Sequence, residues 1–175
     1  SPAIDTSYFN FVSSYYWSST AYSSNAGHAW RVNFSDGYVS LSNKSNTYYV
    51  RAVRGGQSGS LDHLVLNSDN TVTDTDTGLM WQKDGSANKK SWDNSIKYCE
   101  DLEEAGYSDW RMPSANELAS IVKYDTYSPA IDKNYFSAVS SYYWSSTTGS
   151  GGTGDAWRVD FGSGSVGNLV KSNTY

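Results

Sequence analysis

The feature that most constrains this chain is an eight-residue segment, Ser-Ser-Tyr-Tyr-Trp-Ser-Ser-Thr, which occurs twice, at 13–20 and at 140–147. When the two occurrences are superimposed at an offset of 127 residues, residues 1–48 match residues 128–175 at 30 of 48 positions without a gap. Internal repeats decide domain organisation, so they have to be recognised before any fold is assigned. The chain therefore contains two copies of one sequence unit.

The segment between the two copies, roughly 57 to 127, occurs only once. We therefore predict that residues 1–56 are the C-terminal part of a first module. Residues 57–175 form a second module that lacks its final strand. The simplest interpretation is a slice of a longer tandem array. In such an array, residues 49–56 close the first module and an equivalent segment would follow Tyr175.

The composition indicates a folded, strand-rich protein. The chain has 15 Tyr, 7 Trp and 15 Gly, with only 18% charged residues. Aromatic side chains bury large areas, and disordered chains contain few of them. A net charge of −5 argues against nucleic-acid binding, which requires a basic surface. No long apolar run is present, so we expect no direct membrane insertion in this segment. The lone Cys99 excludes an intramolecular disulfide scaffold.

Local patterns in each copy predict short strands. Residues 30–34 alternate apolar and polar side chains, as in a half-buried strand, and Asp36 with Gly37 indicates a hairpin turn. Residues 21–28 are rich in Ala, Ser, Asn and Gly, which favours a surface loop. Residues 48–53 are apolar on both faces and predict a more central strand.

The single-copy segment predicts a hairpin and two helices. Strand-like residues flank an Asp- and Gly-rich tip at 74–78. Ser91 suits a helix N-cap, and the apolar stripe that follows is expected to end at Gly106. Ser114 and Glu117 form the pattern of a capping box for a second helix. Two helices combined with short antiparallel strands and long loops indicate an α+β fold.

Six motifs occur in a recognisable order and carry a family likeness. They are residues 77–82, the helix beginning at Trp92, residues 109–113 with Glu117 and Leu118, and residues 143–147, 156–161 and 49–54. On these motifs the chain resembles the Lcl C-terminal domain family, named for a bacterial collagen-like adhesin. It is also similar to the variable proteins of diversity-generating retroelements. The resemblance implies a C-type-lectin-like fold, an extracellular or cell-surface location, and a role in binding or adhesion.

The differences between the two copies are concentrated in segments. Of the 18 mismatches, fourteen fall between residues 21 and 43. A constant platform with exchangeable loop residues is typical of a binding surface, although free drift of surface loops explains the same pattern. We predict ligand contact by Tyr22, Asn25, His28, Asn33, Asp36, Tyr38, Asp155, Asp160, Ser163, Ser165 and Asn168.

Catalysis has little support in the sequence. His28 and His63 are the only histidines, and Asp155 replaces His28 in the second copy. No serine has an identifiable histidine and carboxylate partner. The formylglycine-generating type of enzyme shares the implied fold but needs active-site cysteines, and Cys99 is expected to be a core residue. We therefore expect no enzymatic activity.

Calcium-dependent sugar binding of the usual lectin type is not expected either. Asp69, Asp74 and Asp76 lie close together, and oxygen-rich loops suit calcium. However, aspartates at a hairpin tip are more often turn formers, and the proline-containing signatures of calcium-dependent lectins are absent. We predict no cofactor, with calcium left open.

Two functions remain. The first is a surface or secreted ligand-binding or adhesion module that presents variable loops to a glycan or protein on another surface. The alternative is a structural repeat subunit of an extracellular fibre or surface layer, in which the same loops contact neighbouring modules of the same protein. The two differ in whether the variable segments face solvent or are buried against a neighbour.

Overall fold

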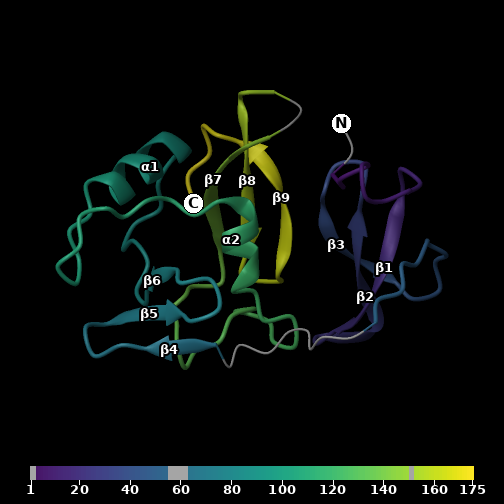
Figure 1. Ribbon diagram of the computed structural model, residues 1–175, viewed down its shortest axis with the longest axis horizontal. Helices are drawn as coiled ribbons and strands as arrows, with labels where there is room; N and C mark the ends of the chain where they lie inside the picture. The colour runs from purple at the N-terminus through teal and green to yellow at the C-terminus, as the bar shows by residue number, and fades with distance from the viewer. Residues whose placement is uncertain (1–2, 55–62, 150–151) are drawn as a thin grey trace.

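The computed structural model describes residues 3–54, 63–149 and 152–175. Its strands form a six-stranded sheet of order β1-β2-β3-β9-β8-β7 and a three-stranded sheet of order β4-β5-β6 (Figure 1). Two short helices accompany them, α1 (Trp92–Glu100) and α2 (Ala115–Ser120). This mixture of helices and strands agrees with the predicted α+β class.

The two copies of the repeat fold into equivalent antiparallel meanders. The strands are β1 (Tyr15–Tyr22), β2 (Asn25–Asn33) and β3 (Val39–Asn43) in the first copy, β4 (Leu64–Leu66), β5 (Thr71–Asp74) and β6 (Met80–Gln82) in the single-copy segment, and β7 (Tyr142–Thr148), β8 (Asp155–Asp160) and β9 (Ser165–Val170) in the second copy. The hairpin of β5 and β6 matches the prediction around residues 74–78. The two meanders join edge to edge through β3 and β9.

The junction between the copies has local two-fold symmetry. Val39 pairs with Val166, its own counterpart in the repeat, and the two strands are antiparallel. A Cβ at Gly37 would lie 3.4 Å from Trp157 Cη2, and a Cβ at the equivalent Gly164 would lie 3.4 Å from Trp30 Cη2. Such reciprocal contacts define an isologous interface. The chain thus resembles a small dimer contained within one polypeptide.

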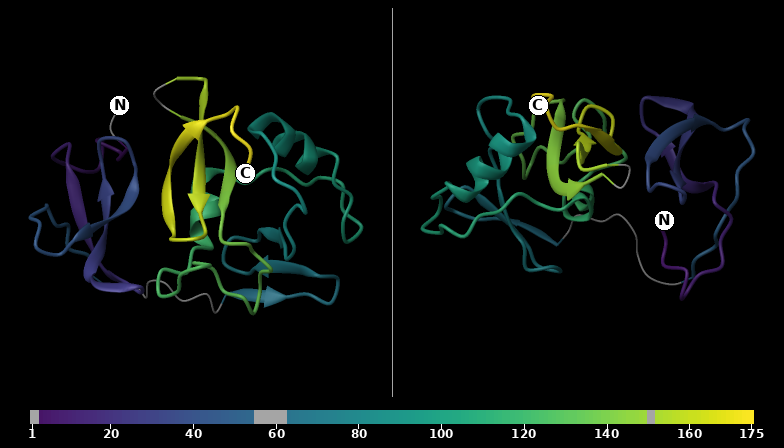
Figure 2. Two further views of the ribbon diagram at one scale, coloured as in Figure 1. Left: turned by 180° about the vertical axis from the view of Figure 1, so that it is seen from behind. Right: turned by 90° about the horizontal axis from the view of Figure 1, so that it is seen from above.

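In the described part of the chain, the helices pack against the sheet of the second copy. Phe161, 1% exposed, and Val159 of β8 pack in one cluster with Leu118 and Ile121, which lie in and just after α2. The helices and the small sheet gather around β7, β8 and β9 (Figure 2), and no described element covers β1, β2 and β3 in the same way. As a result, Phe9 is 45% exposed whereas its counterpart Phe136 is 4% exposed.

Both helices start where the sequence predicts, but α1 ends earlier than predicted. Helix α1 follows Ser91 as predicted but stops at Glu100, short of Gly106. The predicted helix was too long because the chain turns sharply at Glu104–Tyr107, where these two residues exchange backbone hydrogen bonds of 3.1 and 3.0 Å. The capping box of α2 is present, with Glu117 N donating to Ser114 Oγ at 3.3 Å.

Two loop and strand predictions in the first copy were wrong. Most of the expected loop at residues 21–28 is strand, because β1 continues to Tyr22 and β2 begins at Asn25. The expected central strand at 48–53 is reduced to one parallel bridge between Tyr49 and Tyr16 at the outer edge of β1. A strand apolar on both faces needs a layer on each face, and no described element supplies these layers here. The linker or turn expected at 57–60 lies outside the described residues.

Ionisation of Glu117 makes the free energy of unfolding depend on pH. Arg111 donates to both of its carboxylate oxygens at 2.7 and 2.8 Å, and with the Ser114 backbone N–H these bonds lower the pKa of Glu117 to about 2. A carboxylate with a depressed pKa stabilises the fold above its unfolded pKa of about 4.3, and this contribution is lost as the pH falls toward 2. We expect Glu117→Gln to lower the free energy of unfolding at pH 6 by about 1 kcal/mol, because water screens this partly exposed pair.

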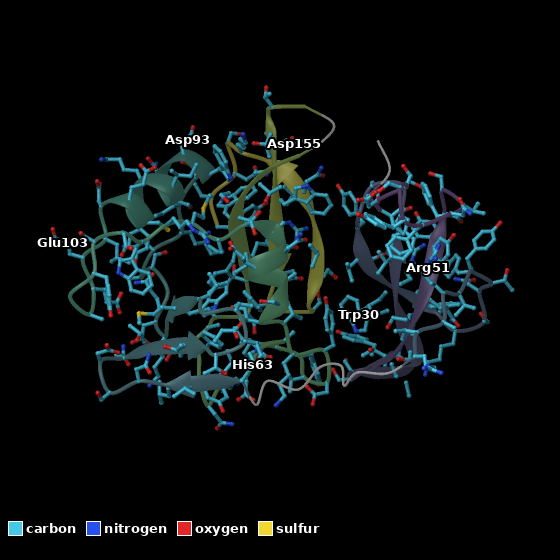
Figure 3. All side chains as sticks on the ribbon, in the orientation of Figure 1. Trp30, Arg51, His63, Asp93, Glu103 and Asp155 are labelled. Carbon is cyan, nitrogen blue, oxygen red and sulfur yellow. The ribbon has the colours of Figure 1, made fainter. Side chains whose placement is uncertain are left out.

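Urea unfolding at pH 6 and at pH 3 measures this contribution. The difference between wild type and Glu117→Gln should shrink at pH 3. Glu103→Gln is the matched control, because Glu103 is exposed and lies near the end of the helical region (Figure 3). If wild type and Glu117→Gln differ in free energy of unfolding by the same amount at pH 6 and pH 3, Glu117 does not contribute to the pH dependence of stability.

Candidate functional site

The predicted ligand residues of the first hairpin hold the turn itself. Asn33, 8% exposed, donates from Nδ2 to Asp36 Oδ2 at 2.7 Å. Asp36 Oδ1 in turn accepts from the Tyr38 backbone N–H at 3.0 Å. These side chains form the hydrogen bonds that hold a tight turn. Their polar atoms are therefore engaged within the hairpin.

The second hairpin is held in a similar way by different residues. Asp160, the counterpart of Asn33, accepts from the Gly162 N–H at 2.8 Å and from Ser163 Oγ at 2.7 Å. Ser163 Oγ lies 3.1 Å from Ser165 Oγ. All three predicted side chains are half-buried. The two copies thus reach the same turn with different polar side chains.

Two further predicted residues meet each other across the junction between the copies. The Tyr38 hydroxyl donates a hydrogen bond to Asn168 Oδ1, and the Tyr38 ring centroid lies 5.4 Å from that of Trp157. Both side chains are half-buried. The structure therefore brings these variable residues together as a contact between the two copies of the repeat.

The remaining predicted residues lie at the loop ends of the meanders. Tyr22 packs edge-on against Trp30 and Tyr127, at centroid distances of 6.0 and 6.4 Å. Asn25 is exposed, and its Oδ1 accepts from the Gly27 N–H at 2.9 Å. Nothing in these contacts tests whether the residues bind a ligand, so their role stays a prediction.

His28, within β2, and Asp155, the first residue of β8, are equivalent in the repeat. His28 is half-buried and pairs in register with Asn43. Asp155 begins β8 beside the loop that follows β7 (Figure 3). Because β3 and β9 are antiparallel, the equivalent loop ends of the two copies point in opposite directions along the sheet. The predicted residues therefore do not form one shared patch.

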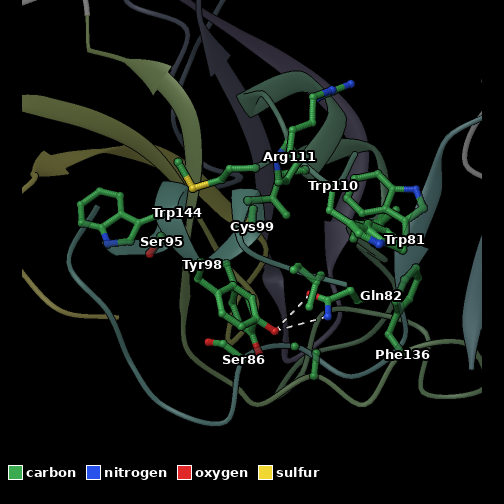
Figure 4. A pocket seen from close by; sticks show the side chains of 18 of the residues that line it. Trp81, Gln82, Ser86, Ser95, Tyr98, Cys99, Trp110, Arg111, Phe136 and Trp144 are labelled. Carbon is green, nitrogen blue, oxygen red and sulfur yellow. Dashed lines mark hydrogen bonds between the residues drawn. The ribbon is translucent and has the colours of Figure 1, made fainter. Parts of the chain in front are cut away.

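Sequence reasoning missed a cavity of about 770 Å³ beside β7. We call it the β7 cavity. Its walls come from β6, α1, residues 109–113 and β7, and they are rich in aromatic rings, including Trp81, Tyr98, Trp110, Phe136 and Trp144 (Figure 4). Among its polar groups, Gln82 donates to Tyr98 Oη at 3.3 Å. The signal in the sequence was the high number of Tyr and Trp residues, which by itself does not separate a cavity wall from a packed core.

Cys99 stands in the wall of this cavity. It packs against the cluster of Met112, Trp144 and Ala156, and burial raises the pKa of the Cys99 thiol to about 11. The thiol is therefore protonated at neutral pH, whereas a cysteine nucleophile has to be a thiolate. Its surroundings are those of the packing residue that the helical spacing predicted.

The aspartates considered as calcium ligands form turns. Asp74, 1% exposed, accepts from the backbone N–H groups of Asp76 and Thr77 at 2.9 and 3.1 Å. Asp69 accepts from the Thr71 N–H and hydroxyl at 3.2 and 2.6 Å. Within the described ranges, no group of three or more His, Cys, Asp and Glu residues is arranged to hold a metal ion.

In the described part of the chain, neither helix has the length and apolar character needed to cross a membrane.

Comparison with known proteins identifies a family. No curated protein and no solved structure matches the chain. The family model described as the Lcl C-terminal domain matches residues 1–54 and 70–175, in agreement with the motif resemblance, and a surface-associated domain is what this family suggests. The chain belongs to the Lcl C-terminal domain family.

Proposed function

We propose that the chain is a surface or secreted ligand-binding and adhesion module, built as a tandem repeat of a C-type-lectin-like fold. The observation that carries the proposal is that both copies keep one platform geometry while their loop residues differ. Arg31 Cζ lies 3.6 Å from the Tyr15 ring centroid, and the equivalent Arg158 Cζ lies 3.8 Å from that of Tyr142. A rigid scaffold with variable loops is a common design for recognition.

The loop ends are the favoured contact surface. Asn25 is exposed, and His28 and Asp155 beside the loops are partly accessible. The hairpin residues, by contrast, use their polar atoms within the turns or between the copies. A glycan or a protein on another surface fits these short polar loops. Two sites at opposite ends of the sheet would also allow one chain to bridge two ligands and gain avidity.

The repeat supplies a matched variant for testing this site. Asn25→Gly combined with His28→Asp gives the first loop end the residues of the second copy at these two positions. We expect this variant to lose at least about tenfold in affinity for ligands that the first loop recognises, a change of about 1.4 kcal/mol in binding free energy. The measurement is a screen of immobilised glycans and intact bacterial or host cell surfaces, followed by titration of each ligand found.

Asp93→Asn serves as the control, because Asp93 is an exposed residue at the start of α1, on the other side of the molecule from Trp30 and the first copy (Figure 3). It should leave binding of the ligands that the first loop recognises unchanged. An identical profile for the loop variant, or the absence of any ligand for the wild type, would count against the proposal.

A second function is favoured by the contact between the copies. Tyr38 and Asn168 belong to the variable hairpins, yet they contact each other across the junction, as the structural alternative requires. In that case the repeat is a subunit of a fibre or surface layer. Electron cryo-microscopy of concentrated protein separates the two functions, since a fibre subunit would form ordered assemblies with the loop ends buried between chains.

A further inference from the structure

Residues that differ between the two copies fit each other across the junction of β3 and β9. The Tyr38 ring lies against Gly167, because a Cβ at Gly167 would lie 2.7 Å from Tyr38 Cε1 and 3.0 Å from Tyr38 Cδ1. Carbon atoms in favourable contact are about 3.5–4.0 Å apart. The Tyr38 ring therefore occupies the space that a side chain at position 167 would need.

Tyr38 is held in this place from two further sides. Its ring centroid lies 5.4 Å from that of Trp157, and its hydroxyl donates to Asn168 Oδ1. Rotation of the ring away from Gly167 would break both contacts. Gly167 is buried within β9, and its φ is not positive, so its backbone would accept a side chain without strain. What excludes a side chain at position 167 is the Tyr38 ring.

The reverse contact of the junction is made by a different pair of residues. The two-fold relation exchanges Tyr38 with Ser165, and Gly167 with Ser40. Where one contact combines a large ring with no side chain, the other therefore combines two small hydroxymethyl groups. Each combination fills its side of the junction.

Pairs made of two identical copies would fit less well at the same junction. Two first copies would place Tyr38 against Ser40 at both contacts, and Leu41 would replace the asparagine that accepts from the Tyr38 hydroxyl. Two second copies would place Ser165 against Gly167 at both contacts, which leaves the volume of the ring empty. Overpacking and cavities both destabilise a packed contact. Only the unlike pair matches a large residue to a vacant position.

We propose that this set of residues determines which copies of the repeat pair, and that it selects a first copy for a second copy over two copies of the same kind. The set consists of Tyr38 and Ser40 in the first copy and Ser165, Gly167 and Asn168 in the second. Specificity between similar partners is a difference of affinities, and a clash in the wrong pair is a common way to obtain it. The inference concerns the pairing of repeats and does not depend on the proposed ligand binding.

Disulfide cross-linking of the 175-residue chain reports this pairing. Val39 and Val166 are directly opposite on antiparallel strands, so their Cα atoms lie within the range of a disulfide. A chain with Val39→Cys and Val166→Cys should therefore form a link between the two introduced thiols in a glutathione buffer. Mass spectrometry of tryptic peptides distinguishes this link from links to Cys99 and from links between different chains.

Gly167→Ser gives the second copy the residue of the first. It should slow formation of the link within one chain at least about tenfold, because the added group overlaps the Tyr38 ring. In a Tyr38→Ser chain the same substitution should change the rate by less than about threefold, because the contact is then serine against serine. Ser40→Gly is the matched control, since it removes a small side chain at the reverse contact, and it should change the rate by less than about twofold.

The reverse contact supplies a second cycle that does not involve Gly167. Ser165→Tyr should slow the link at least about tenfold because the new ring meets Ser40, and Ser40→Gly in the same chain should restore the rate. Circular dichroism confirms that each variant is folded. An equal effect of Gly167→Ser with and without Tyr38, or a Ser165→Tyr defect that Ser40→Gly does not relieve, would overturn these residues as determinants of pairing.

A mixture of single-cysteine chains tests the selection itself. When Val39→Cys chains and Val166→Cys chains are mixed in equal amounts, every link between introduced thiols joins two chains, so neither kind of pair gains from being within one chain. Random pairing makes the link between positions 39 and 166 about half of the total, whereas selection should raise it to at least about nine tenths. A random distribution would overturn the selection of unlike copies.

Discussion

Phe161→Ala is expected to lower the free energy of unfolding by about 3–5 kcal/mol, the usual cost of removing a fully buried aromatic ring. Phe161 is 1% exposed and belongs to the main core cluster of the second copy. Its ring packs edge-on against Tyr143, at a centroid distance of 5.1 Å. Truncation therefore leaves a cavity between β8 and α2 that the surrounding side chains cannot fill completely.

The repeat provides a matched control for this variant. Phe34 is the equivalent residue in the first copy, but it is only half-buried, with Tyr16 as its aromatic neighbour. We expect Phe34→Ala to cost about 1–2 kcal/mol, because less apolar area is lost. Urea unfolding followed by tryptophan fluorescence and circular dichroism measures both variants. Equal losses would show that both copies have a comparably buried core, contrary to the structure.

The second large loss of stability is expected from substitution of Asp74. Asp74→Ala removes an acceptor from two backbone N–H groups at the hairpin tip and should cost about 2–3 kcal/mol, because buried donors are left without partners. Burial raises the pKa of Asp74, but the hydrogen bonds from Thr77 and Asp76, with nearby His63, hold the net pKa below its ordinary value. This stabilisation is present above the unfolded pKa of about 3.9 and is lost as the pH falls.

Asp69→Ala is the control for Asp74→Ala. Asp69 makes the same kind of turn contacts, with Thr71, but it is exposed. Water can replace these bonds, so the expected loss is below about 1 kcal/mol. Thermal and urea unfolding at pH 7 and pH 3 should show that the Asp74→Ala deficit narrows at low pH. A deficit that is the same for both variants would mean that burial of Asp74 does not matter.

The sequence predicted the features that depend on local chemistry. The capping box of Ser114 and Glu117, the turn at Gly37 and the helix start after Ser91 all follow from a few adjacent residues. The end of α1 did not follow, because Ala105 and Gly106 both adopt positive φ in a turn rather than one glycine ending a continuous helix. Local patterns do not reveal how a short turn competes with another helical turn.

The candidate site could not be predicted from local patterns, because it depends on contacts between residues far apart in the sequence. That Tyr38 meets Asn168 depends on the pairing of β3 with β9, which brings together residues 130 positions apart. The β7 cavity depends on the packing of α1 and β6 around β7. Aromatic residues in a core and aromatic residues around a cavity have the same sequence pattern, so the pattern alone did not separate them.

The two-fold junction also has a consequence for how such repeats can diverge. At the symmetry position each residue faces its own duplicate, as Val39 faces Val166. A charge introduced by duplicating one altered copy would therefore meet an identical charge, and like charges directly opposite are destabilising. Within the variable stretch 33–43, only Phe34, Gly37 and Val39 are identical in both copies, and two of these three form the junction. The rest of the hairpin can differ between the copies, whereas the position that faces its own duplicate accepts only a side chain that packs well against an identical one.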